Sequence, residues 1–120
     1  MKYLILIYDN PHSRELFSGP EGAELMAEMD VLLKEITESG ELVMTEALAD
    51  PAQTRTIRVV DGAPAVTDGP YAEAKEHLGG FILVDCATPE RAWDIARRFP
   101  SSRFTPLEVR PIMSPGGAEM

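Results

Sequence analysis

The chain of 120 residues is 44% hydrophobic and 26% charged, the composition of one globular domain and not of a disordered chain. Its formal net charge of −9 repels phosphate backbones, so we expect no direct nucleic-acid binding. Every apolar run is shorter than the roughly 20 residues of a membrane-spanning helix, and no signal peptide is recognisable, so we expect a cytoplasmic protein without membrane association.

The first half of the chain predicts one buried strand and one long helix. The run YLILIY, residues 3–8, is apolar on both faces, as in a strand that is central in its sheet or lies at an interface. The residues 9–11 that follow, DNP, end this strand. A helix is expected to begin at Pro20 and to end just before Gly40. Its apolar stripe, at helical spacing, consists of Leu25, Met29, Leu32, Leu33 and Ile36.

The second half predicts a hairpin followed by another strand, helix and strand. Asp61–Gly62 is a strong two-residue hairpin signal. A helix begins with Thr88 as its cap and Pro89 at its first position, and Pro100 stops it. After the strand at residues 3–8, the further expected strands cover residues 42–48, 54–60, 63–66, 81–85 and 107–112.

This order of elements is the βαββαβ arrangement of the ferredoxin-like α+β class with an inserted β-hairpin. Residues 1–113 form a single domain, and we expect the tail 114–120 to be disordered. Two helices would cover one face of a four-stranded antiparallel sheet, although residues 3–8 present apolar side chains to both faces. A second subunit can bury the other face, so we predict a homodimer whose sheets face each other.

Cysteine, histidine and glycine usage restricts the chemistry that the chain can carry. Cys86 is the single cysteine, so no internal disulfide can form, and its apolar neighbours in the sequence predict a buried thiol. Asp9 and His12 are two potential metal ligands, which do not make a site. No glycine motif precedes a helix as a phosphate-binding loop requires. We therefore expect neither a metal nor a cofactor.

The most distinctive segment is the predicted loop over residues 67–80, TDGPYAEAKEHLGG. It begins with the turn signal Asp68-Gly69-Pro70, and it ends with a glycine pair that leads into a buried strand. Between them, five polar or ionisable side chains fall within seven residues: Tyr71, Glu73, Lys75, Glu76 and His77. The segment is therefore the strongest candidate site in the sequence.

Two of these residues are candidates for acid–base chemistry. Asp68 could act as a base, or it could cap the turn by accepting hydrogen bonds from backbone N–H groups. His77 has an ordinary pKa near 6.5, so it could exchange a proton near neutral pH, or it could be a surface histidine. A folded loop could bring the two side chains together.

The other candidates would bind a substrate. Lys75 is suited to binding an anion, although with Glu73 and Glu76 it could equally form a solvated short helix. Tyr71 could line a pocket, but we favour a role as an anchor of the loop in the core. Gly79, followed by a second glycine, indicates a tight bend or a close approach of the backbone.

The segment VTDGPYAEAKEHLGGFILVD resembles the signature of the DGPF-domain subgroup of the YCII-related family, whose usual form reads close to TDGPFAExKEqLGGyylid. Tyr71 stands where Phe is usual, and His77 stands where Gln is common. The opening KYLILIY, the hairpin with DG, the helix ending in RRFP and the closing LEVRPIM resemble the family as well. The resemblance covers nearly the whole of residues 1–113.

The resemblance implies a dimeric α+β barrel built from ferredoxin-like subunits. The wider YCII-like group includes a dehydrochlorinase-type lyase and is similar to muconolactone isomerases, which implies proton transfer on small oxygenated molecules. Some relatives are associated with extracytoplasmic-function sigma factors. YCII proteins of the shorter type carry a histidine in the first helix, proposed to pair with an aspartate, and that position falls near Met29 here.

Two functional hypotheses follow. The first is a cofactor-free lyase or isomerase in which Asp68 or His77 moves a proton and Lys75 steadies a carboxylate or an enolate. The remaining substrate-binding candidates are Tyr71, Glu76 and Gly79. The second is a non-catalytic small-molecule-binding or regulatory module, which could be associated with an extracytoplasmic-function sigma factor. The absence of the helix histidine favours the second hypothesis, and the dense polar loop favours the first.

Overall fold

The computed structural model describes residues 1–71 and 75–113, so the predicted tail 114–120 and the roles predicted for Glu73 lie outside the described residues. The described strands are β1 (Lys2–Asp9), β2 (Leu42–Ala47), β3 (Arg55–Val60), β4 (Ala63–Asp68), β5 (His77–Asp85) and β6 (Leu107–Pro111). The helices are α1 (Pro11–Ser18), α2 (Gly22–Glu38) and α3 (Pro89–Arg98), with short 3₁₀ turns η1 (Pro51–Gln53) and η2 (Pro100–Arg103).

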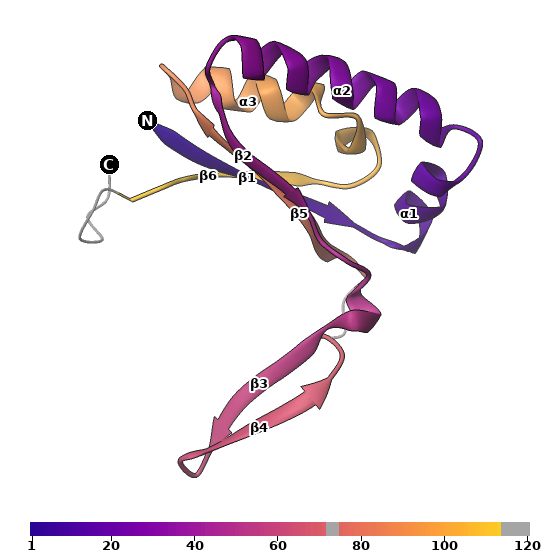
Figure 1. The fold of residues 1–120 in the computed structure, drawn as a ribbon, viewed down its shortest axis with the longest axis vertical. Helices are drawn as coiled ribbons and strands as arrows, with labels where there is room; N and C mark the ends of the chain where they lie inside the picture. Colours follow the sequence, from indigo (N-terminus) through magenta and orange to yellow (C-terminus); the bar gives the residue numbers. More distant parts are fainter. Residues whose placement is uncertain (72–74, 114–120) are drawn as a thin grey trace.

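The larger sheet has the strand order β2-β5-β1-β6, and all neighbouring strands in it are antiparallel. The helices α2 and α3 cover one face of this sheet (Figure 1). Without the hairpin β3–β4, the order of elements is the ferredoxin-like βαββαβ, so the predicted α+β fold is confirmed. None of the helices among the described residues combines the length and the apolar character that crossing a bilayer requires.

The core lies between this sheet and the two helices. Tyr3 and Ile5 of β1 and Ile82 of β5 are buried there against the apolar stripe of α2. The alternate side chains of β1, among them Leu4 and Leu6, point to the opposite face and are only half-buried. The two-faced apolar pattern of residues 3–8 therefore has a covered side and an open side.

The helix α1 is present in the structure but was not predicted from the sequence. Its signal is a capping box around Asn10, whose side chain accepts a hydrogen bond from the Ser13 N–H at 2.8 Å. The Ser13 hydroxyl accepts in return from the Asn10 N–H at 2.9 Å, and Pro11 takes the first helical position. The DNP tripeptide ends β1, as predicted, but it also begins a helix.

The start of α2 is a second correction, because the helix begins at Gly22 and not at Pro20. The chain turns sharply from α1 into α2, and the Gly22 N–H donates to the Gly19 carbonyl at 3.0 Å. A side chain at position 22 would collide with the Phe17 carbonyl. The presence of α1 thus displaces the predicted helix start.

The hairpin β3–β4 forms a separate two-stranded sheet that extends from the body on the side opposite to the helices (Figure 1). Its turn has positive φ at Asp61 (51°) and Gly62 (79°), as the Asp-Gly signal predicted. β4 continues to Asp68 and β5 begins at His77, so the predicted loop 67–80 is shortened at both ends. The reason is strand pairing, since Asp68 pairs with Arg55 and His77 pairs with Asp9.

Candidate functional site

The candidate site is a cavity of about 550 Å³ between the sheet and the helices α1 and α2, which we call the helix–sheet cavity. It lies where β1 ends, where β5 begins and where β2 leaves the sheet. Its walls combine aromatic and aliphatic side chains with a few polar groups. The lining residues are Ile7, Tyr8, Asp9, Ser13, Arg14, Phe17, Ser18, Met29, Thr45, Glu46, Ala47, Leu48, Gly79, Gly80, Phe99 and Ser101.

An ion pair between Asp9 and Arg14 is the main charged feature of this cavity. Asp9 is the last residue of β1, and α1 places Arg14 one helical turn after Asn10, so that its guanidinium reaches back to the carboxylate. The Arg14 Nη1–Asp9 Oδ1 distance is 2.9 Å, and both side chains are about 30% exposed. Arg14 Nε also lies 3.8 Å from Asp50 Oδ2. One guanidinium thus joins two carboxylates at the rim of the sheet.

Gly79 allows the Asp9 carboxylate to lie against the backbone of β5. The register of β1 and β5 shifts here, with Ile7 opposite Gly80 and Tyr8 opposite Leu78, so Gly79 is the extra residue of a bulge. A Cβ atom at Gly79 would lie 2.8 Å from Asp9 Cγ, closer than van der Waals contact permits. The close approach predicted at Gly79 is therefore an approach between the backbone and the Asp9 side chain.

A free hydroxyl group completes the polar lining. Ser101 is 4% exposed, and its Oγ has no hydrogen-bond partner among the described residues. By contrast, the Ser13 hydroxyl is used in the cap of α1, and Thr45 Oγ1 donates to the Phe81 carbonyl at 2.9 Å. A buried hydroxyl without a partner costs free energy, and a ligand with an oxygen atom can satisfy it.

The apolar wall includes Met29 of α2, which is half-buried and lines the cavity. The family resemblance placed the histidine of shorter relatives near this position. A thioether cannot transfer a proton, so Met29 cannot take the role that the resemblance gives to that histidine. Among the described residues that line the cavity, two carry carboxylates: Asp9 is half-buried and Glu46 is exposed.

Two predicted site residues lie at the base of the hairpin. The Asp68 side chain is 89% exposed, and its Oδ1 lies 3.1 Å from Arg55 Nε. Tyr71 is 74% exposed, and the Arg58 guanidinium lies over its ring at 5.2 Å from the centroid. The preferred role of Tyr71 as an anchor in the core is therefore wrong, since the ring rests on the hairpin surface.

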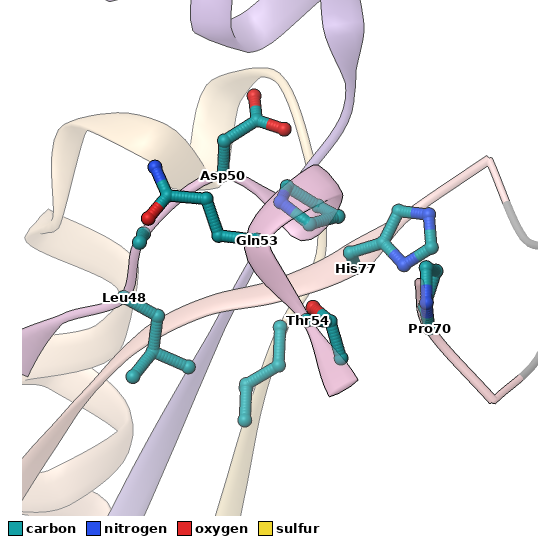
Figure 2. A pocket seen from close by; sticks show the side chains of 9 residues that line it. Leu48, Asp50, Gln53, Thr54, Pro70 and His77 are labelled. Carbon is teal, nitrogen blue, oxygen red and sulfur yellow. The ribbon is translucent and has the colours of Figure 1, made fainter. Parts of the chain in front are cut away.

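His77 lines a second cavity of about 400 Å³, next to η1 (Figure 2). Its imidazole lies beside Pro70, whereas the Asp50 carboxylate is directed away from it (Figure 2). Asp50 instead caps η1 by accepting from the Ala52 N–H at 2.9 Å. Asp68 is not among the residues that line this cavity, so the structure does not bring Asp68 and His77 together there.

Lys75 and Glu76 lie in a third, open depression beside Tyr8 and Glu108. A hydrogen bond with Glu108 raises the pKa of Tyr8 above its ordinary value of 10, and burial and the Glu108 charge add to this effect while Arg110 opposes it. The six predicted site residues among the described ones thus lie at four places: the hairpin, the helix–sheet cavity, the second cavity and the open depression. Gly79 is the one that lines the helix–sheet cavity.

Sequence reasoning missed Asp9, Arg14 and Ser101 as a group. The available signal was the N-cap at Asn10, which would have predicted α1 and placed Arg14 one turn from the end of β1. Ser101 follows the Pro100 that stops α3, and it had no local signal. Its position in the cavity depends on the packing of η2 against the body.

The fold and the site define a small α+β protein with a ligand-sized cavity at one end of its sheet. The family model of the YCII-related domain matches residues 1–114, and the chain belongs to this family. An uncharacterized protein of Rhizobium meliloti (strain 1021), R00369, is 32% identical over 114 residues, which cover 93% of this chain and 92% of that protein.

A solved structure is also similar in fold. It is the 5-chloro-2-hydroxyhydroquinone dehydrochlorinase TftG of Burkholderia phenoliruptrix AC1100, in complex with 2,5-dihydroxybenzoquinone. The TM-score is 0.57 and the alignment covers 94% of each chain, at 13% sequence identity. At this identity, the similarity establishes the ferredoxin-like α+β fold and no more.

Proposed function

We propose that the protein binds a small oxygenated molecule in the helix–sheet cavity and moves a proton of that molecule with Asp9, as a lyase or an isomerase does. The observation that carries the proposal is the Asp9 carboxylate, which Arg14 and the bulge at Gly79 hold at the wall of a cavity of about 550 Å³. A carboxylate fixed beside a bound ligand can accept a proton from carbon or oxygen.

The lining of the cavity supports this chemistry. Apolar side chains such as Phe17 and Phe99 can hold the carbon frame of a ligand, and the free Ser101 hydroxyl can bond one of its oxygens. When Asp9 takes a proton from the carbon next to a carbonyl group, negative charge develops on the carbonyl oxygen. The Arg14 guanidinium can stabilise this enolate. A lyase then expels a leaving group, whereas an isomerase returns the proton to another carbon.

The comparison with TftG suggests the first ligands to try. That protein is a dehydrochlorinase of a chlorinated hydroxyhydroquinone, and its structure contains 2,5-dihydroxybenzoquinone. Small rings that carry several oxygens have both the apolar surface and the hydrogen-bonding groups that the helix–sheet cavity offers.

A non-catalytic binding module is the second candidate, favoured by Met29. Here the thioether stands near the position that the family resemblance assigned to a histidine, so the same cavity could bind a ligand without turning it over. In that case the protein would sense a small molecule. The association with an extracytoplasmic-function sigma factor, which the family resemblance suggests, would then be the interaction to test.

The test measures binding and turnover separately. We expect 2,5-dihydroxybenzoquinone to raise the melting temperature of the protein, and we expect turnover of a chlorinated hydroxyhydroquinone to fall by about 100-fold or more in Asp9→Asn with little loss of binding. Asp30→Asn, at an exposed site on α2, is the matched control. Binding without turnover in the unmodified protein would instead support the binding module.

The candidates from the sequence can be tested in the same assay. We expect Asp68→Asn and His77→Gln to retain ligand binding and turnover, since neither residue lines the helix–sheet cavity. If these variants lose turnover while Asp9→Asn keeps it, then the assignment to Asp9 is wrong and the site lies at the base of the hairpin.

A further inference from the structure

The second cavity, of about 400 Å³ beside η1, is lined by polar side chains to which the proposed function gives no role. Gln53, Thr54 and His77 contribute an amide, a hydroxyl and an imidazole. None of these three groups has a hydrogen-bond partner among the described residues, although Thr54 and His77 are half-buried. An amide, a hydroxyl and a neutral imidazole can each donate and accept hydrogen bonds, so together they can bind a polar group of a ligand.

The second cavity adjoins the helix–sheet cavity. Leu48 lines both of them, and its backbone N–H donates to the Gly79 carbonyl at 2.9 Å. The start of β5 is likewise shared, because His77 and Leu78 line the second cavity and Gly79 lines the helix–sheet cavity. A ligand that lies along this stretch of β5 would therefore contact both cavities beside Leu48.

Arg14 connects an acid of one cavity to an acid of the other. Its Nη1 lies 2.9 Å from Asp9 Oδ1 at the wall of the helix–sheet cavity. Its Nε lies 3.8 Å from Asp50 Oδ2 at the wall of the second cavity. Asp50 is also held by η1, since its Oδ1 accepts from the Ala52 N–H at 2.9 Å. Both oxygens of this carboxylate thus face an N–H group, so Asp50 does not require a cationic ligand.

We propose that the two cavities form one bipartite site for a ring that carries several oxygens and a short neutral side chain. This inference rests on the proposed function, which places the ring beside Asp9. The ring occupies the helix–sheet cavity, and the side chain passes Leu48 into the second cavity, where its terminal hydroxyl or amide group meets the free polar side chains. Each cavity is within the range of about 300–1,000 Å³ that is usual for ligand sites.

The lining of the second cavity determines the character of the ligand's side chain. Leu48 and Leu78, which are 47% and 40% exposed, offer apolar surface to its methylene groups. Asp50 disfavours another carboxylate nearby, so the end of the side chain is polar but uncharged. His77 then binds the substrate and does not move its proton, although strand pairing sets it opposite Asp9. A ring without a side chain does not reach His77, which agrees with the retained activity expected of His77→Gln.

Two exposed alanines on either side of Asp50 provide a matched test. Ala49 lines the second cavity and not the helix–sheet cavity, whereas Ala52 lines neither. Calorimetry should show that 3-(3-hydroxypropyl)-2,5-dihydroxybenzoquinone binds the unmodified protein at least about 10-fold more tightly than 2,5-dihydroxybenzoquinone. Ala49→Phe fills the second cavity and should reduce this advantage to less than about twofold, while the affinity for the ring alone stays the same. Ala52→Phe should keep the advantage.

The 3-butyl derivative, which has the same chain length but no hydroxyl group, separates polar recognition from filling of the cavity. We expect it to bind about fivefold less tightly than the hydroxypropyl derivative. Equal binding of the two derivatives, no gain over the ring alone, or an advantage that Ala49→Phe and Ala52→Phe affect equally would overturn the bipartite site. Binding and turnover of the ring alone would then still support the proposed function, whereas failure of all three ligands to bind would overturn both.

Discussion

At the residue scale, the contact between Gly79 and Asp9 determines the geometry of the candidate site. Asp9 ends β1, and its carboxylate occupies the space that any side chain at position 79 would need. The glycine pair in the signature segment thus has a physical explanation. One glycine accommodates a carboxylate, and the next accommodates the Glu46 carbonyl, which would lie 2.8 Å from a Cβ at Gly80.

This contact predicts the effect of Gly79→Ala. The added methyl group must displace the Asp9 carboxylate and weaken its ion pair with Arg14, so we expect a loss of about 1–3 kcal/mol in the free energy of unfolding, measured by urea denaturation. In an Asp9→Ala background the collision is relieved, and the same substitution should cost less than about 1 kcal/mol. Equal costs in the two backgrounds would show that the clash with Asp9 is not the cause.

At the element scale, the short helix α1 links the end of β1 to the wall of the cavity. Its capping box is local, but its consequence is not, because α1 carries both Arg14 and the aromatic side chain of Phe17 into the helix–sheet cavity. Local capping therefore supports the geometry of the site.

We accordingly predict that Asn10→Ala lowers both stability and ligand affinity. The loss of a helix cap costs about 1 kcal/mol, and a frayed α1 would no longer hold Arg14 beside Asp9. Thr88→Ala removes the cap of α3, which accepts from the Arg91 N–H at 3.2 Å, and it serves as the control. It should cost similar stability but leave the affinity for 2,5-dihydroxybenzoquinone unchanged, as calorimetry can measure.

At the scale of the whole molecule, a cluster of charges joins α2, α3 and the start of β2. Arg91 of α3 lies 2.9 Å from Glu41 and 3.2 Å from Glu35, and Arg98 also bonds Glu35. The hydrogen bonds from Arg98, and then from Arg91, lower the pKa of Glu35 from 4.5 to about 2. The hydrogen bond from Arg91 likewise lowers the pKa of Glu41. Arg91 and Arg98 are thus paired with acids of the same chain.

This cluster predicts how stability depends on pH. A carboxyl group whose pKa is lower in the folded state stabilises the protein above its unfolded pKa, and this stabilisation disappears as the pH falls through the folded value. Stability should therefore decrease between about pH 4.5 and about pH 2. Urea midpoints measured across this range should decrease less steeply in Arg91→Met. Arg97→Met, at a 72% exposed site, is the control and should keep the slope of the unmodified protein.

The features that neighbouring residues control could be predicted from the sequence alone. The apolar run of residues 3–8, the stripe of α2, the Asp61–Gly62 turn and the Thr88 cap are each local patterns, and together they predicted the fold. The signature segment predicted the family for the same reason, since it is contiguous.

The contacts between side chains of the candidate site could not be predicted in this way, because they depend on the tertiary structure. Asp9, Arg14, Gly79 and Ser101 come from four separate segments, and their convergence depends on the register shift between β1 and β5 and on the capping of α1. The tertiary structure also separates the six described site candidates of the signature segment, which lie at the hairpin, in the two cavities and in the open depression. Register and packing are set by contacts between residues distant in sequence, whereas the patterns that can be read along a chain are local.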